Sequence, residues 1–239
     1  MKHILFPDNT QKRLVYYLAA EEYVADVLGE GFFLWTSRPT VIFGRNQDME
    51  AEVNVKYCQE NSIEMYRRKS GGGCVYSDEG NLMLSCVFRN SDVESSFARY
   101  LSCLVEALRT LGLPVVSSSH NDVLVGDRKV SGNACFLKGA STIVHGTLIV
   151  DMDFGKLQNA ITPSEAKLAS HGVKSVRQRV SSLRELGVSA DIATIKNIIA
   201  DSFCSGVQML ETEDMKAIQT LELPYLDPEF VSSGILKNG

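Results

Sequence analysis

The chain has 239 residues, of which 44% are hydrophobic and 22% charged, and its formal net charge is −5. This composition is typical of one folded domain with an apolar core, and the acidic balance disfavours a nucleic-acid-binding protein, whose phosphate contacts require a basic surface. The N-terminal residues turn polar after six positions and no apolar run has the length of a membrane span, so we expect neither a secretory signal nor a membrane anchor.

Cysteine usage indicates a reducing compartment. The six cysteines are scattered singly and form no CxxC pair, so neither a zinc knuckle nor a dithiol redox motif is predicted. Reduced thiols fit a cytoplasmic protein. The cysteines are Cys58, Cys74, Cys86, Cys103, Cys135 and Cys204.

The first predicted element is a helix over residues 10–28, which Gly29 and Gly31 end. Its core-facing residues recur at helical spacing and are Leu14, Leu18, Val24, Val27 and Leu28. Further elements up to residue 88 are a strand at 32–35, a turn at 37–39, a strand at 40–43, a short helix near 54–60, and strands at 63–67 and 81–88.

A long amphipathic helix is predicted after residue 90. Ser91 and Glu94 have the S-x-x-E spacing of a capping box at its start. Its apolar stripe is predicted to be core rather than a binding surface. The stripe consists of Val93, Phe97, Leu101, Leu104, Leu108 and Leu111.

The second half of the chain predicts a run of strands and then helices. Strands are expected at 114–117, 121–125, 129–137 and 141–150, with a hairpin turn at 126–128. From Phe154 the pattern is helical, most clearly in a helix marked by Ile192, Ile195, Ile198, Ile199 and Phe203. Because helices and hairpin-joined strands are mixed without strict βαβ alternation, we predict an α+β domain with a largely antiparallel sheet flanked by helices.

The most informative segment, residues 66–85, reads YRRKSGGGCVYSDEGNLMLS. Cationic side chains hold phosphate or carboxylate oxygens, and glycines let a ligand lie directly on the backbone. Arg67, Arg68 and Lys69 followed by Gly71, Gly72 and Gly73 therefore predict a cradle for an anion joined to an apolar body. A flexible turn beside a solvated basic patch is the alternative that these residues leave open. The spacing matches neither GxxxxGK[ST] nor GxGxxG.

A predicted hairpin brings a second set of polar residues together. Asn121, Asp122 and Lys129 fall on neighbouring strands, and Ser131-Gly132 follows the lysine, so an ammonium group is expected beside a backbone opening. Taken alone, Lys129 is more typical of a solvated strand residue. His145 lies in the apolar strand IVHGTLIV, where a buried, hydrogen-bonded histidine is the simplest interpretation. No further ligand sits at metal-binding spacing nearby, so no tightly bound metal is predicted there.

These pieces resemble the lipoate–protein ligase A family. Five blocks in the family's order, from about Val41 to Leu186, carry the resemblance. They are VIFGRNQ, RRKSGGGCVYSDEGN, NDVLVGDRKVSGNA, HGTLIVDMDFGKL and KLASHGVKSVRQRVSSLREL. The resemblance implies the antiparallel sheet flanked by helices that is shared with biotin ligases and octanoyl transferases.

The resemblance also implies a reaction, in which lipoate and ATP, with Mg²⁺, give lipoyl-AMP and a lysine of a lipoyl-carrier domain then takes the lipoyl group. The carrier would be a 2-oxoacid dehydrogenase E2 subunit or the glycine cleavage carrier protein. Lys129 would bridge the carboxylate and the α-phosphate, Arg68 would neutralise phosphate charge, and His145 would lie near the lipoyl end. The remaining implied contacts are Gly71, Gly72 and Gly73 with the lipoyl chain, Cys74, Val75 and Tyr76 with the nucleotide, and Asn121 and Asp122 with the adenylate and magnesium.

Two departures from the family pattern stand out. Ser77 occupies the position of the motif's usual histidine. The chain stops at Gly239, so we expect one catalytic domain over residues 1–239 without the further C-terminal domain of two-domain ligases. That expectation raises the possibility of a separate small accessory protein that assists lipoate activation.

Two other functions remain open. The first is an acyl transferase of the same fold, which needs a cysteine nucleophile. The two places where such enzymes carry it are residues 115–118 and 163–164 here, and neither contains cysteine, although Cys135 lies close to Lys129 in sequence. The second is a non-catalytic binder of lipoyl-AMP or a carrier domain. The combination of Arg68, three glycines and Lys129 favours ATP chemistry over both.

Overall fold

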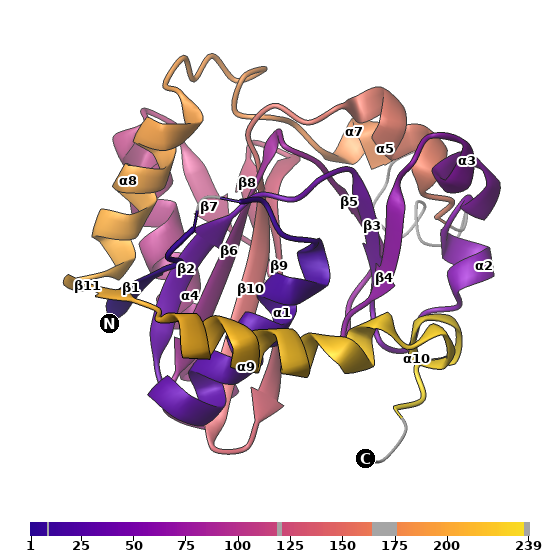
Figure 1. Ribbon diagram of the computed structural model, residues 1–239. Coiled ribbons are helices and arrows are strands. Elements are labelled where there is room, and N and C mark those ends of the chain that lie inside the picture. The colour runs from indigo at the N-terminus through magenta and orange to yellow at the C-terminus, as the bar shows by residue number, and fades with distance from the viewer. Residues whose placement is uncertain (9, 119–120, 164–175, 237–239) are drawn as a thin grey trace.

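The computed structural model describes residues 1–8, 10–118, 121–163 and 176–236, which form two sheets surrounded by helices (Figure 1). The large sheet has the strand order β11-β1-β2-β6-β10-β9-β8-β7. Its strands are β1 (Lys2–Leu5), β2 (Gly31–Trp35), β6 (Asn81–Phe88), β7 (Val115–Ser117), β8 (Asp122–Val125), β9 (Arg128–Lys138), β10 (Ser141–Ile149) and β11 (Gly206–Met209). The small sheet has the order β4-β3-β5 and consists of β3 (Thr40–Phe43), β4 (Glu64–Arg67) and β5 (Val75–Ser77).

Helices cover both faces of the large sheet. They are α1 (Leu14–Tyr23), continued by a π-helical turn (Val24–Leu28), then α2 (Met49–Glu52), α3 (Val55–Glu60), α4 (Val93–Thr110), α5 (Phe154–Ala160), α7 (Val176–Arg179), α8 (Ile192–Phe203), α9 (Thr212–Glu222), a 3-10 turn (Leu223–Leu226) and α10 (Pro228–Ser233). No helix in the described part of the chain has the length and apolar character needed to cross a membrane.

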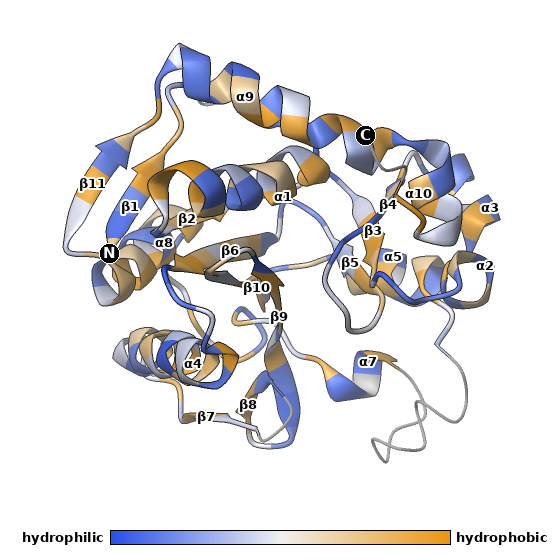
Figure 2. Cartoon of the chain, turned by 90° about the horizontal axis from the view of Figure 1, so that it is seen from below, coloured by the Kyte–Doolittle hydropathy of each residue, from blue (hydrophilic) through white to orange (hydrophobic). Residues whose placement is uncertain are grey.

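The central strand β6 shows why the sheet is buried on both sides. Alternate residues of a strand face opposite sides of the sheet. Leu82 and Leu84 pack with α4 and α8, whereas Met83 and Val87 pack with α1 and α9, and all four are buried. Figure 2 shows these two helical layers on either side of the strands, with apolar colour concentrated between them.

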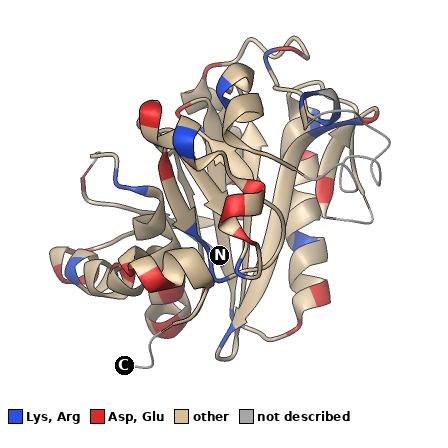
Figure 3. Ribbon diagram, turned by 90° about the vertical axis from the view of Figure 1, so that its right-hand side faces the viewer, with Lys and Arg blue, Asp and Glu red and all other residues tan. Residues whose placement is uncertain are grey.

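Most pairings in the large sheet are antiparallel, as predicted. β6 pairs antiparallel with both β2 and β10, and the β10-β9-β8-β7 meander continues antiparallel. Among the described strands of the large sheet, only β1 pairs in parallel, with β2 on one side and β11 on the other, and in the small sheet β3 pairs in parallel with β4. The predicted α+β class is therefore confirmed. Along the ribbon in Figure 3, acidic and basic residues are interspersed, in keeping with the small net charge.

Two local predictions are wrong. Val27 is 60% exposed rather than in the core, because the last five residues of the first helix form a wider π-helical turn that shifts the apolar face. The cap of α4 is Asp92, whose carboxylate accepts a hydrogen bond from the Ser95 amide, so Ser91 and Glu94 form no capping box. Strands β2 and β3 lie on either side of the connection at 37–39, as predicted, and belong to different sheets.

Candidate active site

A cavity of about 130 Å³ lies where the two sheets approach each other. One wall is the chain around β5, and the opposite wall comes from β9 and β10. Helices α5 and α7 close it on a third side with apolar side chains. Its lining includes Cys74, Val75, Tyr76, Lys129 and Gly132, together with Asn81, Thr147, Leu157 and Arg179. The fold therefore joins residues 74–76, directly after the three glycines, to the lysine hairpin, which is more than fifty residues away in sequence.

The Lys129 ammonium group lies at this cavity in an ion pair. Its Nζ is 2.7 Å from Asp122 Oδ1, and the other carboxylate oxygen, Oδ2, accepts a 2.6 Å hydrogen bond from Arg179. Burial lowers the pKa of Lys129, and Asp122 offsets part of that effect. The arrangement places two cations around one carboxylate at the cavity wall. A metal at Asp122 would have to displace one of those cations.

A β-bulge turns Lys129 toward the cavity. Asp122 pairs with Gly132, Val123 with Ser131, and Leu124 with Lys129, so β9 contains one extra residue, Val130. In a regular strand Lys129 and Gly132, three positions apart, would face opposite sides. The bulge brings them to one side. A Cβ atom at Gly132 would lie 2.5 Å from Lys129 Nζ, so the lysine needs the glycine.

Asn121 contributes its backbone carbonyl to the hairpin. It is exposed and has a φ of +73°, in the left-handed region. Its carbonyl oxygen accepts a 2.8 Å hydrogen bond from Asn133 Nδ2, and Asn133 Oδ1 accepts one of 2.9 Å from the Tyr100 hydroxyl. Helix α4 is thereby connected through Asn133 to Asn121, the residue before Asp122. Neither Asn133 nor Tyr100 was predicted as a site residue.

Arg68 does not face solvent. Its guanidinium group binds the loop that contains Gly71, Gly72 and Gly73, which we call the glycine loop. It donates to the carbonyl oxygens of Gly71 and Gly73, at 2.7–3.1 Å, and to that of Ile42 at 3.3 Å. Burial lowers the pKa of Arg68 to about 10. The solvated basic patch considered above is therefore wrong for Arg68, which is 6% exposed. In this conformation the guanidinium shapes the loop.

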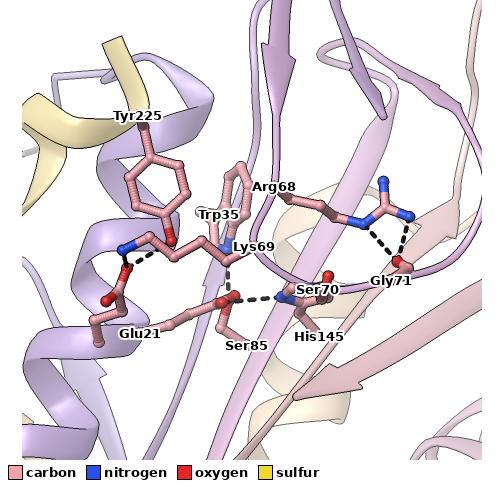
Figure 4. Close-up of polar contacts among 10 residues, drawn as sticks. Glu21, Trp35, Arg68, Lys69, Ser70, Gly71, Ser85, His145 and Tyr225 are labelled. Atoms are coloured by element: carbon pink, nitrogen blue, oxygen red, sulfur yellow. Dashed lines mark hydrogen bonds and ion pairs between the residues drawn. The ribbon is translucent and has the colours of Figure 1, made fainter. Parts of the chain in front are cut away.

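His145 belongs to a buried chain of hydrogen bonds (Figure 4). Its Nε2 is 2.8 Å from Ser70 Oγ, and its Nδ1 is 2.9 Å from Glu21 Oε2. Ser85 donates to Glu21 Oε1 and in turn accepts from the Trp35 indole. His145 is hydrogen-bonded as expected, but it is partly rather than fully buried. Glu21 was missed, although an acidic pair within the apolar helix sequence LAAEEYVA was a signal for it.

Ser77, in the place of the family's histidine, is fully buried and does not line the cavity. Its hydroxyl lies 2.7 Å from the Ser37 hydroxyl, in the connection between β2 and β3, and donates to Met83 Sδ. Here the residue stabilises the junction of the two sheets. The neighbouring Asp78 accepts hydrogen bonds from the Tyr76 hydroxyl and the Gly80 amide, which orders the following turn.

Asn81, the last residue of the glycine motif, lines the cavity with an unsatisfied donor. Its Oδ1 accepts from the Asp78 amide, but its buried Nδ2 has no hydrogen-bond partner within the described part of the chain. A buried donor without a partner costs about 1–3 kcal/mol. Among the described residues, no three His, Cys, Asp or Glu side chains converge as a metal site.

The two places where an acyl transferase of this fold would carry its nucleophile, residues 115–118 and 163–164, hold no cysteine. Residues 115–117 form β7 and Pro163 lines the cavity, while Ser164 and the first part of the KLASHGVKSV block, residues 167–175, lie outside the described residues. Burial raises the pKa of the Cys135 thiol, which disfavours its thiolate. Cys74 does line the cavity. Arg179, within the described part of that block, was not predicted as a site residue.

Known proteins resemble this chain both in sequence and in fold. Residues 14–204 match the family model described as the lipoyl protein ligase A/B catalytic domain. A curated relative, lipoate–protein ligase 1 of Staphylococcus aureus, is 37% identical over 214 residues, which are 85% of this chain. The chain spans 65% of that relative's length.

Two solved structures share the fold. One belongs to a study of an archaeal lipoylation system, a bi-partite lipoate protein ligase and its E2 lipoyl domain from Thermoplasma acidophilum. It has a TM-score of 0.85 and 24% identity over 99% of this chain and 98% of that chain. The other is a lipoate-protein ligase A bound with ATP, with a TM-score of 0.82 and 22% identity over 98% of this chain and 99% of that chain. At these identities the likeness concerns the fold.

Proposed function

Because the chain belongs to the lipoyl protein ligase A/B catalytic domain family, we propose that it activates lipoate with ATP and transfers the lipoyl group to a lysine of a lipoyl-carrier domain. The observation that carries this proposal is the Lys129 ammonium on the wall of a cavity that residues 74–76, directly after the three glycines, also line. A cavity that joins a cation to apolar walls suits an acyl phosphate with an apolar chain.

In the first step a carboxylate oxygen of lipoate attacks the α-phosphorus of ATP. The bond to the β-phosphate breaks, and pyrophosphate leaves with the electron pair. Lys129 would hold the carboxylate and α-phosphate oxygens together and offset the negative charge that develops. To do so it must exchange part of its ion pair with Asp122 for the ligand, with Arg179 remaining on that carboxylate. Mg²⁺ would enter with ATP as part of the substrate.

In the second step the amine of a carrier lysine attacks the carbonyl carbon of lipoyl-AMP. An amide forms, AMP leaves with the electron pair of the broken anhydride, and the amine loses its extra proton. Cys74, Val75 and Tyr76 would contact the nucleotide, and Asn81 Nδ2 offers a donor that a ligand oxygen or nitrogen would satisfy. The lipoyl chain would lie along Gly71–Gly73 toward His145.

The E2 lipoyl domain of the archaeal study supports a carrier of that class for this chain as well. That study describes its ligase as bi-partite, and we propose that a small accessory protein likewise speeds adenylate formation here. The chain alone is then expected to pass the lipoyl group from preformed lipoyl-AMP quickly and to make lipoyl-AMP from ATP slowly. Closure over the substrates is the step that a partner would complete.

The test supplies the purified chain with an E2 lipoyl domain and either lipoyl-AMP or lipoate, ATP and Mg²⁺. Mass spectrometry of the lipoyl domain detects the added lipoyl group. Fast transfer from lipoyl-AMP with slower transfer from ATP agrees with the proposal. Equal rates from both would refute the accessory protein. If neither lipoyl-AMP nor lipoate with ATP gives transfer, the result favours a non-catalytic binder. An acyl-thioester on Cys74 or Cys135 would instead indicate the acyl transferase.

A further inference from the structure

The chain after α9 packs against the strand that enters the glycine loop (Figure 1). We call residues 223–236 the C-terminal segment; it contains the 3-10 turn and α10. Its anchors Tyr225 and Phe230 are buried and contact each other edge to face. The segment lies beyond residues 14–204, where the family model matches, so the comparison assigns it no role.

Successive side chains of residues 67–70 point in alternating directions, as their contacts show. Arg68 and Ser70 face the ligand side, where they bond the glycine-loop carbonyls and His145. Arg67 and Lys69 face the other way, toward the C-terminal segment. The three cations that seemed to form one anion cradle are thus divided between two tasks.

Arg67 is 1% exposed, and its guanidinium group donates to five backbone carbonyls of described residues. Two belong to the C-terminal segment, Val231 at 3.0 Å and Ser232 at 2.7 Å. Three belong to the loop after β3, namely Gly44, Arg45 and Gln47, at 2.7–3.3 Å. A buried guanidinium is stable only while such acceptors surround it, so Arg67 fixes the loop and the segment to each other.

The loop after β3 rests directly on the glycine loop. The Arg45 amide donates to the Ser70 carbonyl at 2.9 Å. A Cβ atom at Gly44 would lie 2.2 Å from the Gly72 carbonyl oxygen, which leaves no space between the two backbones. A displacement of the loop after β3 therefore displaces Gly72 as well.

Lys69 makes the second connection (Figure 4). Its Nζ is 2.6 Å from Glu22 Oε1 and 4.6 Å from the centre of the Tyr225 ring. The Tyr225 hydroxyl donates to the same Glu22 oxygen at 2.6 Å. Burial alone would raise the pKa of Glu22, but Lys69, Tyr225 and Lys138 together lower it, so the carboxylate stays ionised.

We propose that the C-terminal segment positions the glycine loop for its ligand through Arg67 and Lys69, which are positioning residues rather than ligand-binding cations. The nature of that ligand rests on the proposed function. If the glycine loop is loosened, it must be reordered each time the ligand binds. The apparent affinity for the ligand then falls in proportion to the fraction of molecules whose loop already has the binding conformation. Once bound, the ligand restores the arrangement, so the chemical step is retained.

The test compares Tyr225→Phe and Arg67→Lys with two matched controls. Tyr23→Phe removes another tyrosine hydroxyl bonded to a carboxylate, that of Asp214 on α9. Arg109→Lys changes another arginine that donates to a carbonyl, that of Val115. Neither control contacts the glycine loop. Tyr225→Phe keeps the ring against Lys69, so it gives an answer even where Arg67→Lys does not fold.

Hydrogen exchange of the ligand-free proteins at amides 70–76 is the first measurement, and it does not depend on activity. We expect amide exchange at least about tenfold faster in Tyr225→Phe and in Arg67→Lys, because each of these substitutions removes a hydrogen bond in which one partner is charged. Exchange at the same amides should be unchanged in the two controls. Unchanged exchange in Tyr225→Phe, or equal acceleration in the controls, overturns the proposal.

Kinetics with lipoate and ATP are the second measurement. We expect KM for lipoate to rise at least about tenfold in the two variants with kcat within about threefold of wild type. A fall in kcat alone with KM unchanged overturns the positioning role. A wild-type protein without ligase activity would refute the proposed function, while the exchange measurement would still decide whether the segment positions the loop.

Discussion

Gly132→Ala isolates the geometry that the β-bulge creates at Lys129. The new methyl carbon would lie 2.5 Å from both Cε and Nζ of the lysine. Ordinary carbon contacts are about 3.5–4.0 Å, so the ammonium must move by roughly 1 Å. That movement disrupts the 2.7 Å ion pair with Asp122.

A misplacement of about 1 Å in a catalytic group costs about 10²-fold in rate, or roughly 2.7 kcal/mol. Folding should not suffer, because the clash involves the mobile end of a side chain and alanine is favoured over glycine in a strand by about 0.5–1 kcal/mol. We therefore expect lipoyl-AMP formation to fall about 10²-fold while Tm stays the same or rises.

The assay is steady-state lipoyl-AMP formation, with Tm from thermal unfolding. A double-mutant cycle with Lys129→Ala identifies the cause, since two residues that act together are not additive. In the Lys129→Ala background, adding Gly132→Ala should cost nothing more. Near-normal activity of Gly132→Ala, or a loss that adds fully to that of Lys129→Ala, would refute the reasoning.

Other variants test separate parts of the site. The proposed role of Lys129 requires its protonated form, and its pKa is lowered, so activity should fall as pH rises through a value below 10.5. Asp122 raises that pKa, so Asp122→Asn should move the alkaline limb of the pH–rate profile to lower pH, and an unmoved limb would argue against Lys129. Replacing Cys74 and Cys135 by serine should leave transfer rates within about threefold, as expected when neither thiol is a nucleophile; a trapped acyl-thioester in the wild type would disprove this. Ser77→His should destabilise the fold by about 1–3 kcal/mol in denaturant unfolding, because the position is fully buried, and an unchanged midpoint would contradict that packing.

The central fold was predictable because its strands and helices carry strong local patterns. β6 was predicted with the bounds that it has, 81–88, and the β8–β9–β10 meander follows from its hairpin signals. β1 and β11 were missed, since each has four residues and they pair with each other in parallel across two hundred positions. Such pairing depends on the tertiary fold rather than on local sequence.

Contacts in the site were predictable from sequence where one hairpin brings two residues together. They were not predictable where the direction of a side chain depends on tertiary packing. Asp122 and Lys129 meet because they share a hairpin. The sequence RRKS does not reveal that Arg67 points to the C-terminal segment and Arg68 to the glycine loop, because those directions follow from carbonyls up to 165 positions away. Glu21 and Arg179 likewise reach their partners only in the folded chain.

Lipoate-dependent exchange between ATP and labelled pyrophosphate tests the proposed function most directly. Exchange requires reversible formation of the acyl-adenylate and no carrier protein. We predict exchange that depends strictly on lipoate, increases with the accessory protein, and disappears in Lys129→Ala while that variant keeps its wild-type circular dichroism spectrum. Exchange without lipoate, exchange that persists in Lys129→Ala, or its absence in the wild type under all these conditions would contradict the account.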